Sequence, residues 1–316
     1  MTDQYGRDIR YLRLSVTERC TLRCAYCRAE EGLCPKQAEL SAESFVRIVR
    51  VMASLGVNKV RVTGGEPLLR RDLSALLRDI RGIEGIEELN LTTNAQQLPG
   101  QASALKAAGL DRLNISIDSL RAARYAEMTG GGSLGAVLCG IEEALVAGFA
   151  PVKLNVVLLR GVNDDEVDDF IALTKERPID VRFIELMPFG IGGDDDRRVT
   201  GAELRAARPR LTPVEKRYES QPSDDYRMPG HVGRVCFIDA VTRRFCASCN
   251  RIRLMSDGRL RPCLGQDTEV SLLDALAAKD DEGLRERIRR AIYEKPAAHG
   301  FDGGFSSGRD MSRIGG

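Results

Sequence analysis

Short apolar runs recur through the first part of the chain and predict six β-strands. Within each run, hydrophobic residues tend to lie at every second position, the spacing that places them on one face of a strand. The predicted strands are residues 11–16, 59–63, 87–92, 112–118, 151–158 and 179–185. Because stretches with a different period separate them, the strands are expected to pair in parallel.

The stretches between these strands carry the helical period. Ser41 is expected to cap a helix with apolar residues at positions 45, 48, 52 and 55 and with Gly56 at its end. Two further helices are expected around residues 73–80 and 134–145. Six βα units predict an α/β fold, an open, partial (βα)6 barrel of the TIM type with its functional loops at the carboxyl ends of the strands.

The pattern changes after Gly190. Residues 190–198 and 218–230 are rich in Gly, Asp and other polar residues, which predicts a loop region or linker. We therefore expect a barrel unit over residues 1–230 and a smaller unit over residues 231–316 that closes the open side of the barrel. Residues 300–316, the end of this second unit, show no periodicity and are expected to be too irregular for a helix.

The charge balance indicates that any anion-binding site must be local. With 47 basic and 46 acidic residues the net charge is +1, so neither nucleic acid nor an anionic membrane is an expected partner. No apolar run has the length of a membrane span, and residues 1–10 lack the features of a signal or transit peptide. The expected location is the cytoplasm, where nine cysteines should not form disulfides. Three isolated cysteines, Cys34, Cys139 and Cys236, are expected to be bystanders.

A first group of cysteines follows directly after the first predicted strand. Cys20, Cys24 and Cys27 have the spacing C-x3-C-x2-C. A loop of this kind can turn three thiolates toward one iron–sulfur cube and leave one iron without a protein ligand. A structural zinc site normally has four protein ligands, and no fourth is adjacent here. The spacing therefore favours a cluster with an open iron.

A second group lies in the C-terminal region. Cys246, Cys249 and Cys263 have the spacing C-x2-C-x13-C, which again offers three thiolates and predicts a second cluster. The alternative is a zinc site whose fourth ligand is Cys236 or His231.

Basic residues fall where a barrel packed on itself would be apolar. Four lie in the middle of predicted strands, and two alternate on a strand-like run beside the second cysteine group. These six are Arg13, Arg61, Lys153, Arg182, Arg251 and Arg253. Buried cations need partners, and ion pairs with Asp118 or Glu185 would satisfy only one or two of them. The set favours a polyanion such as a nucleoside triphosphate, and the absence of a P-loop motif indicates a substrate rather than a fuel.

The first cysteine group, together with the GGEP segment at residues 64–67, resembles the radical S-adenosylmethionine (SAM) superfamily. The resemblance implies that the amino and carboxylate groups of SAM chelate the open iron of a [4Fe-4S] cluster. It implies SAM contacts by Tyr26, Gly65, Glu66, Ser116 and Met187. By residue type alone, Ser116 would instead be structural and Met187 a core residue.

The whole chain resembles the GTP 3′,8-cyclases of molybdenum-cofactor synthesis. This narrower resemblance lies in the two cysteine groups, the run FCASCNRIRL, the segment LRPC and the C-terminal MSRIGG. It implies two [4Fe-4S] clusters, and it implies that Gly315 and Gly316 reach into the active site, where glycine is slim enough to enter. The residues implied to bind GTP are Arg13, Arg61, Thr92, Lys153, Arg182, Arg251 and Arg253.

The same resemblance implies the chemistry. SAM would be reduced to methionine and a 5′-deoxyadenosyl radical, which removes hydrogen from C3′ of GTP so that C3′ attacks C8. The product would be 3′,8-cyclo-7,8-dihydro-GTP, which a separate synthase converts to cyclic pyranopterin monophosphate. An external electron donor is required, and the sequence leaves the donor and the oligomeric state open, a homodimer included.

Some positions depart from the family pattern. Arg28 and Ala29 stand where Met-Pro is usual, and Cys236, Asp239 and Ala240 replace apolar and Ser-Pro residues. These changes put substrate positioning in question rather than cluster binding. Two other functions stay open: another two-cluster radical SAM enzyme, such as a peptide or protein maturase, and a zinc-stabilised nucleotide-binding protein that is not an enzyme.

Overall fold

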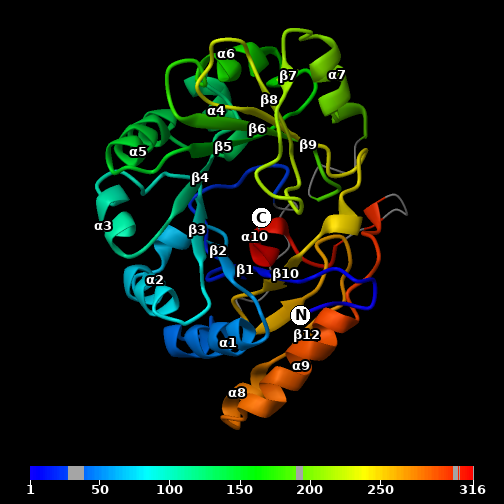
Figure 1. Ribbon diagram of the computed structural model, residues 1–316. Coiled ribbons are helices and arrows are strands. Elements are labelled where there is room, and N and C mark those ends of the chain that lie inside the picture. Colours follow the sequence, from blue (N-terminus) through cyan, green and yellow to red (C-terminus); the bar gives the residue numbers. More distant parts are fainter. Residues whose placement is uncertain (28–38, 190–194, 302–304, 306, 316) are drawn as a thin grey trace.

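The computed structural model describes residues 1–27, 39–189, 195–301, 305 and 307–315. Its centre is one sheet of twelve strands in the order β12-β11-β10-β1-β2-β3-β4-β5-β6-β9-β8-β7. The sheet curves around the short C-terminal helix α10, which Figure 1 shows in the middle of the molecule. None of the helices within these residues has the length and apolar content of a membrane span.

The six central strands are the predicted ones, and they all pair in parallel. They are β1 (Tyr11–Ser15), β2 (Lys59–Thr63), β3 (Glu88–Thr93), β4 (Arg112–Ser116), β5 (Val152–Val157) and β6 (Ile179–Ile184). Every boundary lies within two residues of its prediction. The α/β class and the partial (βα)6 barrel are therefore confirmed.

Helices cover the outer face of these strands (Figure 1). They are α1 (Ala42–Ser54), α2 (Leu73–Arg81), α3 (Ala102–Ala107), α4 (Ala122–Thr129), α5 (Leu134–Val146) and α6 (Val167–Ala172), with the short turns η1 (Pro67–Leu69) and η2 (Asp164–Glu166). Ser41 caps α1 as predicted, since its hydroxyl accepts the backbone N–H of Ser44 at 3.2 Å. Fully buried apolar residues of the strands and of these helices share one core, including Leu12, Val60 and Leu77.

The C-terminal part of the chain extends the barrel wall at both edges. At one edge β9 (Val235–Ile238) pairs with β6, followed outward by β8 (Asp224–Arg227) and β7 (Thr212–Pro213). At the other edge β10 (Arg251–Leu254) pairs with β1, followed by β11 (Arg259–Arg261) and β12 (Val270–Ser271). Both β9 and β10 run parallel to their central neighbours. Because one sheet joins strands from both predicted units, the division at residue 230 stays a prediction.

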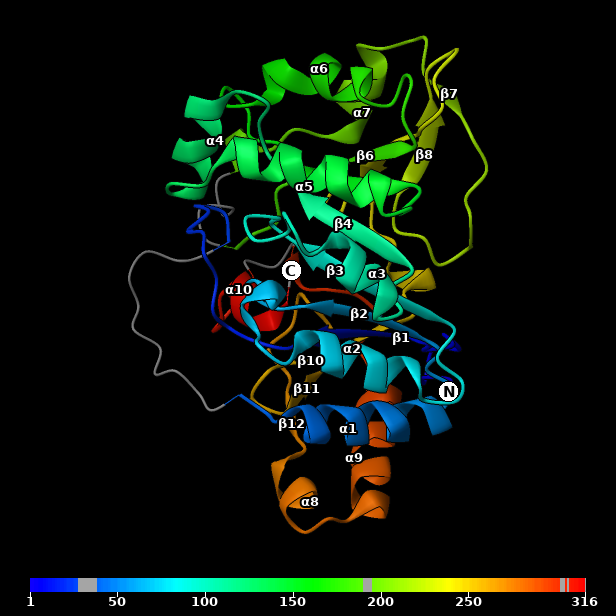
Figure 2. The same cartoon turned by 90° about the vertical axis from the view of Figure 1, so that its left-hand side faces the viewer.

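The remaining elements lie around these edges. They are η4 (Asp195–Arg197), α7 (Gly201–Ala206), η5 (Cys246–Ser248), α8 (Leu273–Ala277), α9 (Asp281–Tyr293) and α10 (Met311–Ile314). An ion pair of 2.6 Å between Arg47 on α1 and Asp281 joins the C-terminal helices to the barrel. Figure 2 shows α10 on the side of the sheet toward which the arrow of β4 points. The carboxyl ends of the strands are where a barrel of this type carries its functional loops.

The prediction of a loop region or linker over residues 218–230 is wrong at Asp224–Arg227, where the strand β8 lies. Its polar residues satisfy one another: Asp225 accepts hydrogen bonds from Ser223 and Gln221, both at 2.8 Å, and pairs with Arg234 at 3.0 Å. This mutual pairing allows a polar segment to join a sheet, and it depends on contacts that residue type does not reveal.

The prediction that residues 300–316 are too irregular for a helix is also wrong, at Met311–Ile314. A single helical turn is unstable alone and needs tertiary packing. Met311 and Ile314 provide it, because they pack with Phe189 and Phe301 in a separate small cluster.

Candidate active site

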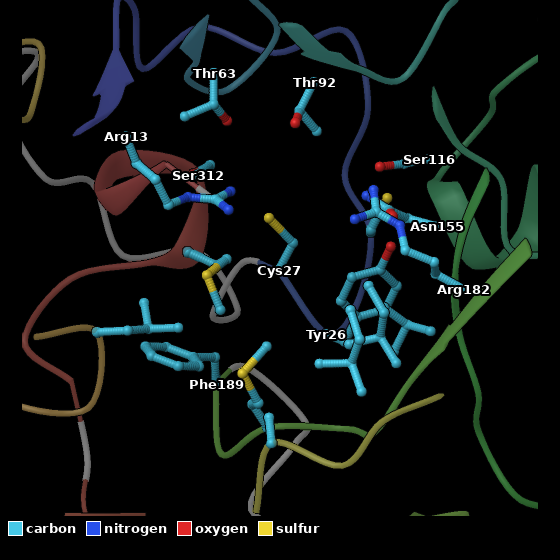
Figure 3. A pocket seen from close by; sticks show the side chains of 18 of the residues that line it. Arg13, Tyr26, Cys27, Thr63, Thr92, Ser116, Asn155, Arg182, Phe189 and Ser312 are labelled. Atoms are coloured by element: carbon cyan, nitrogen blue, oxygen red, sulfur yellow. The ribbon is translucent and has the colours of Figure 1, made fainter. Parts of the chain in front are cut away.

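A cavity of about 270 Å³ lies inside the curve of the sheet. All six central strands and β10 contribute to its wall, and residues at alternating strand positions, such as Arg61 and Thr63, face it together. Figure 3 shows Arg13 and Arg182 pointing inward from opposite sides, with Cys27 between them and Ser116 and Asn155 near Arg182. The cavity thus joins the first cysteine group to the predicted cationic residues.

The three cysteines of the first group line this cavity. Burial raises the pKa of the Cys24 thiol, and the nearby Asp118, Cys27 and Cys20 raise it further. A bound metal ion would favour loss of these protons to solvent, because its positive charge stabilises the thiolates. The Asn94 side chain donates a weak hydrogen bond to the Cys20 sulfur at 3.6 Å.

Gly65 also lines the cavity, at the point where the GGEP segment meets the cysteine loop. A Cβ atom at this position would lie 2.3 Å from the carbonyl oxygen of Arg19 and 2.7 Å from that of Glu18. The backbone N–H of Gly65 donates to the Thr17 carbonyl at 2.8 Å. Glycine is therefore required here by the close approach of the cysteine loop.

Glu66 is fully buried and is absent from the residues that line the cavity. Its carboxylate accepts hydrogen bonds from the Thr93 hydroxyl at 2.7 Å, the Asn94 backbone at 2.7 Å and the Leu68 backbone at 3.1 Å. Burial raises its pKa to about 7 against these hydrogen bonds. Glu66 therefore joins the loops that follow β2 and β3. A direct contact of Glu66 with SAM stays a prediction.

The other predicted SAM-binding residues, Tyr26, Ser116 and Met187, line the cavity. The Tyr26 hydroxyl donates to Asp118 at 2.6 Å, and Asp118 also accepts the Val157 backbone N–H at 2.9 Å. Burial raises the pKa of Asp118 to about 6 despite these two donors. This carboxylate fixes Tyr26 against the end of β4.

The carboxylates expected as alternative partners for the cations are engaged elsewhere. Asp118 holds Tyr26, and Glu185 accepts the backbone N–H groups of Val241 at 2.7 Å and Thr242 at 3.0 Å. Oε1 of Glu185 lies 3.9 Å from Nε of Arg198, which is not one of the six predicted cations. Ion pairs with these two carboxylates therefore do not explain why the strand cations are buried.

Five of the six predicted cations line the cavity, namely Arg13, Arg61, Arg182, Arg251 and Arg253. The strand register places Arg13 beside Arg61 on β2 and beside Arg253 on β10, so like charges are neighbours. Burial, and then the charge of Arg61, lower the pKa of Arg182 to about 10. Within the described residues, Nε and Nη2 of Arg182 and Nε of Arg61 are buried without a hydrogen-bond acceptor.

Lys153, the sixth cation, is buried on β5 but is not among the lining residues. Burial, then the charges of Arg182 and Arg61, lower its pKa to about 7. Neutral polar groups lie nearby. In the part of the chain that the structure describes, Thr92 Oγ1, Asn155 Oδ1 and both polar side-chain atoms of Asn114 are buried without hydrogen-bond partners. So many unsatisfied polar groups in one region indicate a polar, anionic ligand.

The second cysteine group lies next to the cavity, and its neighbours Phe245 and Leu264 line the wall. Cys246 is in η5, Cys249 precedes β10 and Cys263 follows β11. Burial would raise the pKa of Cys249, but Arg251 and Lys295 outweigh it and lower the pKa to about 6. A thiolate is the form that binds metal.

The residues expected to complete a zinc site have other partners. His231 Nδ1 lies 2.8 Å from the Thr174 hydroxyl, and Cys236 is on β9, where its strand neighbour is Arg182. Among the described residues, no three Cys, His, Asp or Glu side chains already form a metal site. The members of each cysteine group are nevertheless close enough to influence one another's ionisation. Both groups therefore offer three soft donors that a cluster would draw together.

Gly315 is buried between the first and second strands of the barrel and β10. A Cβ atom on it would lie 2.8 Å from Cγ2 of Thr63 and 3.2 Å from Cβ of Ser15. Its φ angle is +82°, and its carbonyl accepts a hydrogen bond from Nη1 of Arg253. Gly316, Arg28, Ala29 and Cys34 lie outside the described residues.

The other sequence departures and isolated cysteines are placed as follows. Asp239 pairs with Arg205 at 3.3 Å, and Ala240 lines the cavity. Cys139 is exposed on α5.

Several lining residues were not predicted from the sequence. They include Tyr11, Asn94, Phe189, Tyr218 and Ser312. Tyr11 could have been found, because it lies two positions before Arg13 on the same strand face. Tyr218 lies outside the barrel strands and reaches the cavity through tertiary structure, so no local signal marks it.

Comparison with protein families gives two matches along the chain. Residues 14–174 match the Radical SAM superfamily. Residues 179–301 match the family described as Molybdenum Cofactor Synthesis C.

Full-length relatives are also similar to the chain. The GTP 3′,8-cyclase of Alkaliphilus oremlandii (strain OhILAs) is 46% identical over 322 residues that cover 100% of both chains. The mitochondrial GTP 3′,8-cyclase of Arabidopsis thaliana is 42% identical over 325 residues, which cover 100% of this chain and 83% of the relative.

Solved structures show the same fold. Streptococcus suis SuiB bound to S-adenosylmethionine is similar with a TM-score of 0.63 and 16% identity, over 90% of this chain and 68% of SuiB. The FeFe-hydrogenase maturase HydG from Carboxydothermus hydrogenoformans has a TM-score of 0.51 and 20% identity, over 63% of this chain and 49% of HydG. At such identities the likeness concerns the fold alone.

Proposed function

The chain belongs to the GTP 3′,8-cyclase family of the radical SAM superfamily, and on this basis we propose that it converts GTP to (8S)-3′,8-cyclo-7,8-dihydroguanosine 5′-triphosphate in molybdenum-cofactor biosynthesis. The observation that carries the proposal is the composition of the cavity. One wall holds the three thiols of Cys20, Cys24 and Cys27. The strands around it supply buried guanidinium groups, and among the described residues Nε of Arg61 and Nε and Nη2 of Arg182 have no hydrogen-bond acceptor. A site of this kind suits SAM chemistry on a polyphosphorylated substrate.

The donor sets fit two [4Fe-4S] clusters and SAM. Each cysteine group supplies three thiolates, and Tyr26, Gly65, Ser116 and Met187 line the space beside the first group. When bound, the first cluster supplies the electron that cleaves SAM, and the second offers an open iron for the purine ring. Membership of the superfamily establishes SAM and an iron–sulfur cluster, and the count of two is part of our proposal.

The part of the protein in this reaction is binding and orientation. The arginines on the cavity wall and Lys153 would hold the triphosphate, and Thr92 would hydrogen-bond the nucleotide. The reaction breaks C3′–H and forms the C3′–C8 bond, and the ring then gains one electron and one proton. The product therefore has the same elemental composition as GTP.

Two electrons per turnover must come from an external donor, one to cleave SAM and one to complete the product. A separate synthase would consume the cyclic nucleotide and form cyclic pyranopterin monophosphate. A peptide or protein maturase, the alternative within the superfamily, has no evident use for this many cavity arginines.

Anaerobic incubation of the reconstituted protein with GTP, SAM and dithionite tests the proposed function. The expected result is 5′-deoxyadenosine together with a nucleotide that has the mass of GTP and a different retention time. Only unchanged GTP, in a preparation that does cleave SAM, would refute the cyclase activity.

We predict that the buried cations of the strands bind the phosphates. Replacing Arg61, Lys153 or Arg182 with Ala should weaken GTP binding by about 1.5–3 kcal/mol each, because a charge-assisted interaction is lost. Iron content and SAM binding should not change. Calorimetric titration measures the effect, with Arg290→Ala as the control, since Arg290 is 72% exposed on α9. Equal wild-type affinities for GTP and guanosine would contradict this role.

Lys153 also predicts a pH dependence. Its pKa of about 7 in the free protein should rise when a phosphate lies beside it, so GTP binding should take up a proton above pH 7. The affinity should then fall between pH 7 and 9, by at most about tenfold per pH unit for one proton. Titration in buffers of different ionisation enthalpy measures the uptake. A Lys153→Met variant should lose it, and an equal uptake in that variant would assign the proton to another group.

A further inference from the structure

The C-terminal segment of residues 307–315, here called the strut, contacts both cysteine-bearing loops. On one side lies the loop of residues 16–27, which carries the first cysteine group, and on the other the loop of residues 262–269, which carries Cys263. Figure 1 places α10, the helical part of the strut, in the middle of the molecule. The strut can therefore fix the position of one loop relative to the other.

A backbone hydrogen bond and an ion pair join the strut to the first loop. The backbone N–H of Met311 donates to the carbonyl of Cys27 at 3.1 Å. Arg313 forms an ion pair with Glu18 at 3.1 Å, and the two side chains are only 9% and 16% exposed. Glu18 also belongs to the stretch of loop that packs on Gly65.

A denser set of contacts joins the strut to the second loop. Arg309 pairs with Glu269 at 2.8 Å and also, outside this loop, with Asp257 in the turn between β10 and β11 at 2.9 Å. The Gly308 backbone N–H and the Ser307 hydroxyl donate hydrogen bonds to the Asp267 carboxylate, at 3.2 and 3.3 Å respectively.

Arg261 links these contacts to the metal-binding end of the loop. It is fully buried, pairs with Asp267 at 2.7 Å and donates to the carbonyl of Cys263 at 3.2 Å. The strut is thus connected to one cysteine of each group through few intermediates.

We propose that Arg313 and Arg309 are positioning residues that hold the strut between the two cluster loops and thereby place Gly315 against Arg253. The proposal rests on the proposed function, since it concerns how SAM cleavage and cyclisation are kept in step. The strut holds Gly315 directly, because the Gly315 backbone N–H donates to the Met311 carbonyl at 3.0 Å. The carbonyl of Gly315 accepts from Arg253, and a Cβ on this residue would lie 2.8 Å from Cγ2 of Thr63. Largely buried ion pairs are costly to break from one side, so each anchor should matter.

The test compares the variants Arg313→Gln, Glu18→Gln, their double variant and Arg309→Gln as reconstituted holoenzymes. We expect at least about tenfold faster amide exchange over residues 311–315, because the anchored turn opens more often. The ratio of cyclic product to 5′-deoxyadenosine should fall at least about tenfold, because positioning errors uncouple the two steps. Iron content should stay at the wild-type value, and Arg313→Lys should recover part of both losses.

The matched control is Arg290→Gln, which removes an arginine from an exposed pair of 2.9 Å with Glu294. It should leave exchange and coupling unchanged. The double variant should be no worse than the more affected single variant, since both substitutions remove one interaction.

Wild-type exchange and coupling in Arg313→Gln would overturn the proposal. If Glu18→Gln loses iron, the Arg313 and Arg309 variants test the proposal instead, because both residues lie outside the two loops. Loss of iron in these variants as well would show a purely structural role and would also overturn the proposal. The two proposals can also fail separately. If the wild type makes no cyclic product, the proposed function is refuted. Faster amide exchange in the variants than in that wild type would still support the role of the strut.

Discussion

Replacing Cys24 with Ala is expected to abolish SAM cleavage. A cluster held by three thiolates has no spare protein ligand, and SAM binds only to the iron that they leave open. Reconstituted wild-type protein should contain about eight irons per chain and the variant about four, because the second cysteine group remains. Iron and sulfide analysis, together with chromatography of 5′-deoxyadenosine after reduction, measures both effects.

Cys139→Ala is the matched control, because Cys139 is exposed on α5 and belongs to neither group. It should keep both clusters and full SAM cleavage. A wild type with about four irons in total would refute the two-cluster assignment. Continued formation of 5′-deoxyadenosine by the Cys24 variant would refute the role of the first group.

Replacing Gly315 with Ala is expected to reduce cyclisation by about 100-fold or more while SAM cleavage continues in part. The added methyl group would lie 2.8 Å from Cγ2 of Thr63, so the strut must shift by a substantial fraction of an ångström. Displacements near 1 Å can cost about 100-fold in rate when reacting groups must be aligned. Both clusters and GTP binding should be retained, which iron analysis and calorimetry would show.

Gly85→Ala separates crowding from backbone strain. Gly85 has φ +88°, close to the +82° of Gly315, but a Cβ atom on it meets nothing within 4 Å. The two variants therefore share the cost of a left-handed alanine, and of the two only Gly315→Ala crowds Thr63, a residue of the cavity wall. Cyclisation at the wild-type rate in Gly315→Ala would show that this residue does not position the reaction.

The six central strands were predictable because alternation and strand length are local properties. Arg13 and Arg61 could be identified as site residues for the same reason, since a charge inside an apolar strand breaks the pattern. The strand Asp224–Arg227 was missed because its polar residues are satisfied by one another after folding. The turn Met311–Ile314 was missed because its stability comes from contacts with distant segments.

Side-chain direction explains why parts of the site differ from the sequence prediction. Glu66 was predicted to contact SAM from the family resemblance, and Lys153 was predicted at the cavity from its place in the middle of a strand, yet neither lines the cavity. The Glu66 carboxylate instead accepts hydrogen bonds from Thr93 and Asn94, because the end of β3 and the loop after it lie beside it. The role of Asp118 in fixing Tyr26 depends on the folded position of the cysteine loop, which residue spacing does not determine.

The most direct test of the central claim uses GTP that carries deuterium only at C3′. The claim predicts that 5′-deoxyadenosine gains one deuterium and that the cyclic product, which retains the mass of unlabelled GTP, loses it. Formation of the cyclic product with unlabelled 5′-deoxyadenosine, or with deuterium retained in the nucleotide, would contradict hydrogen removal from C3′ at this site.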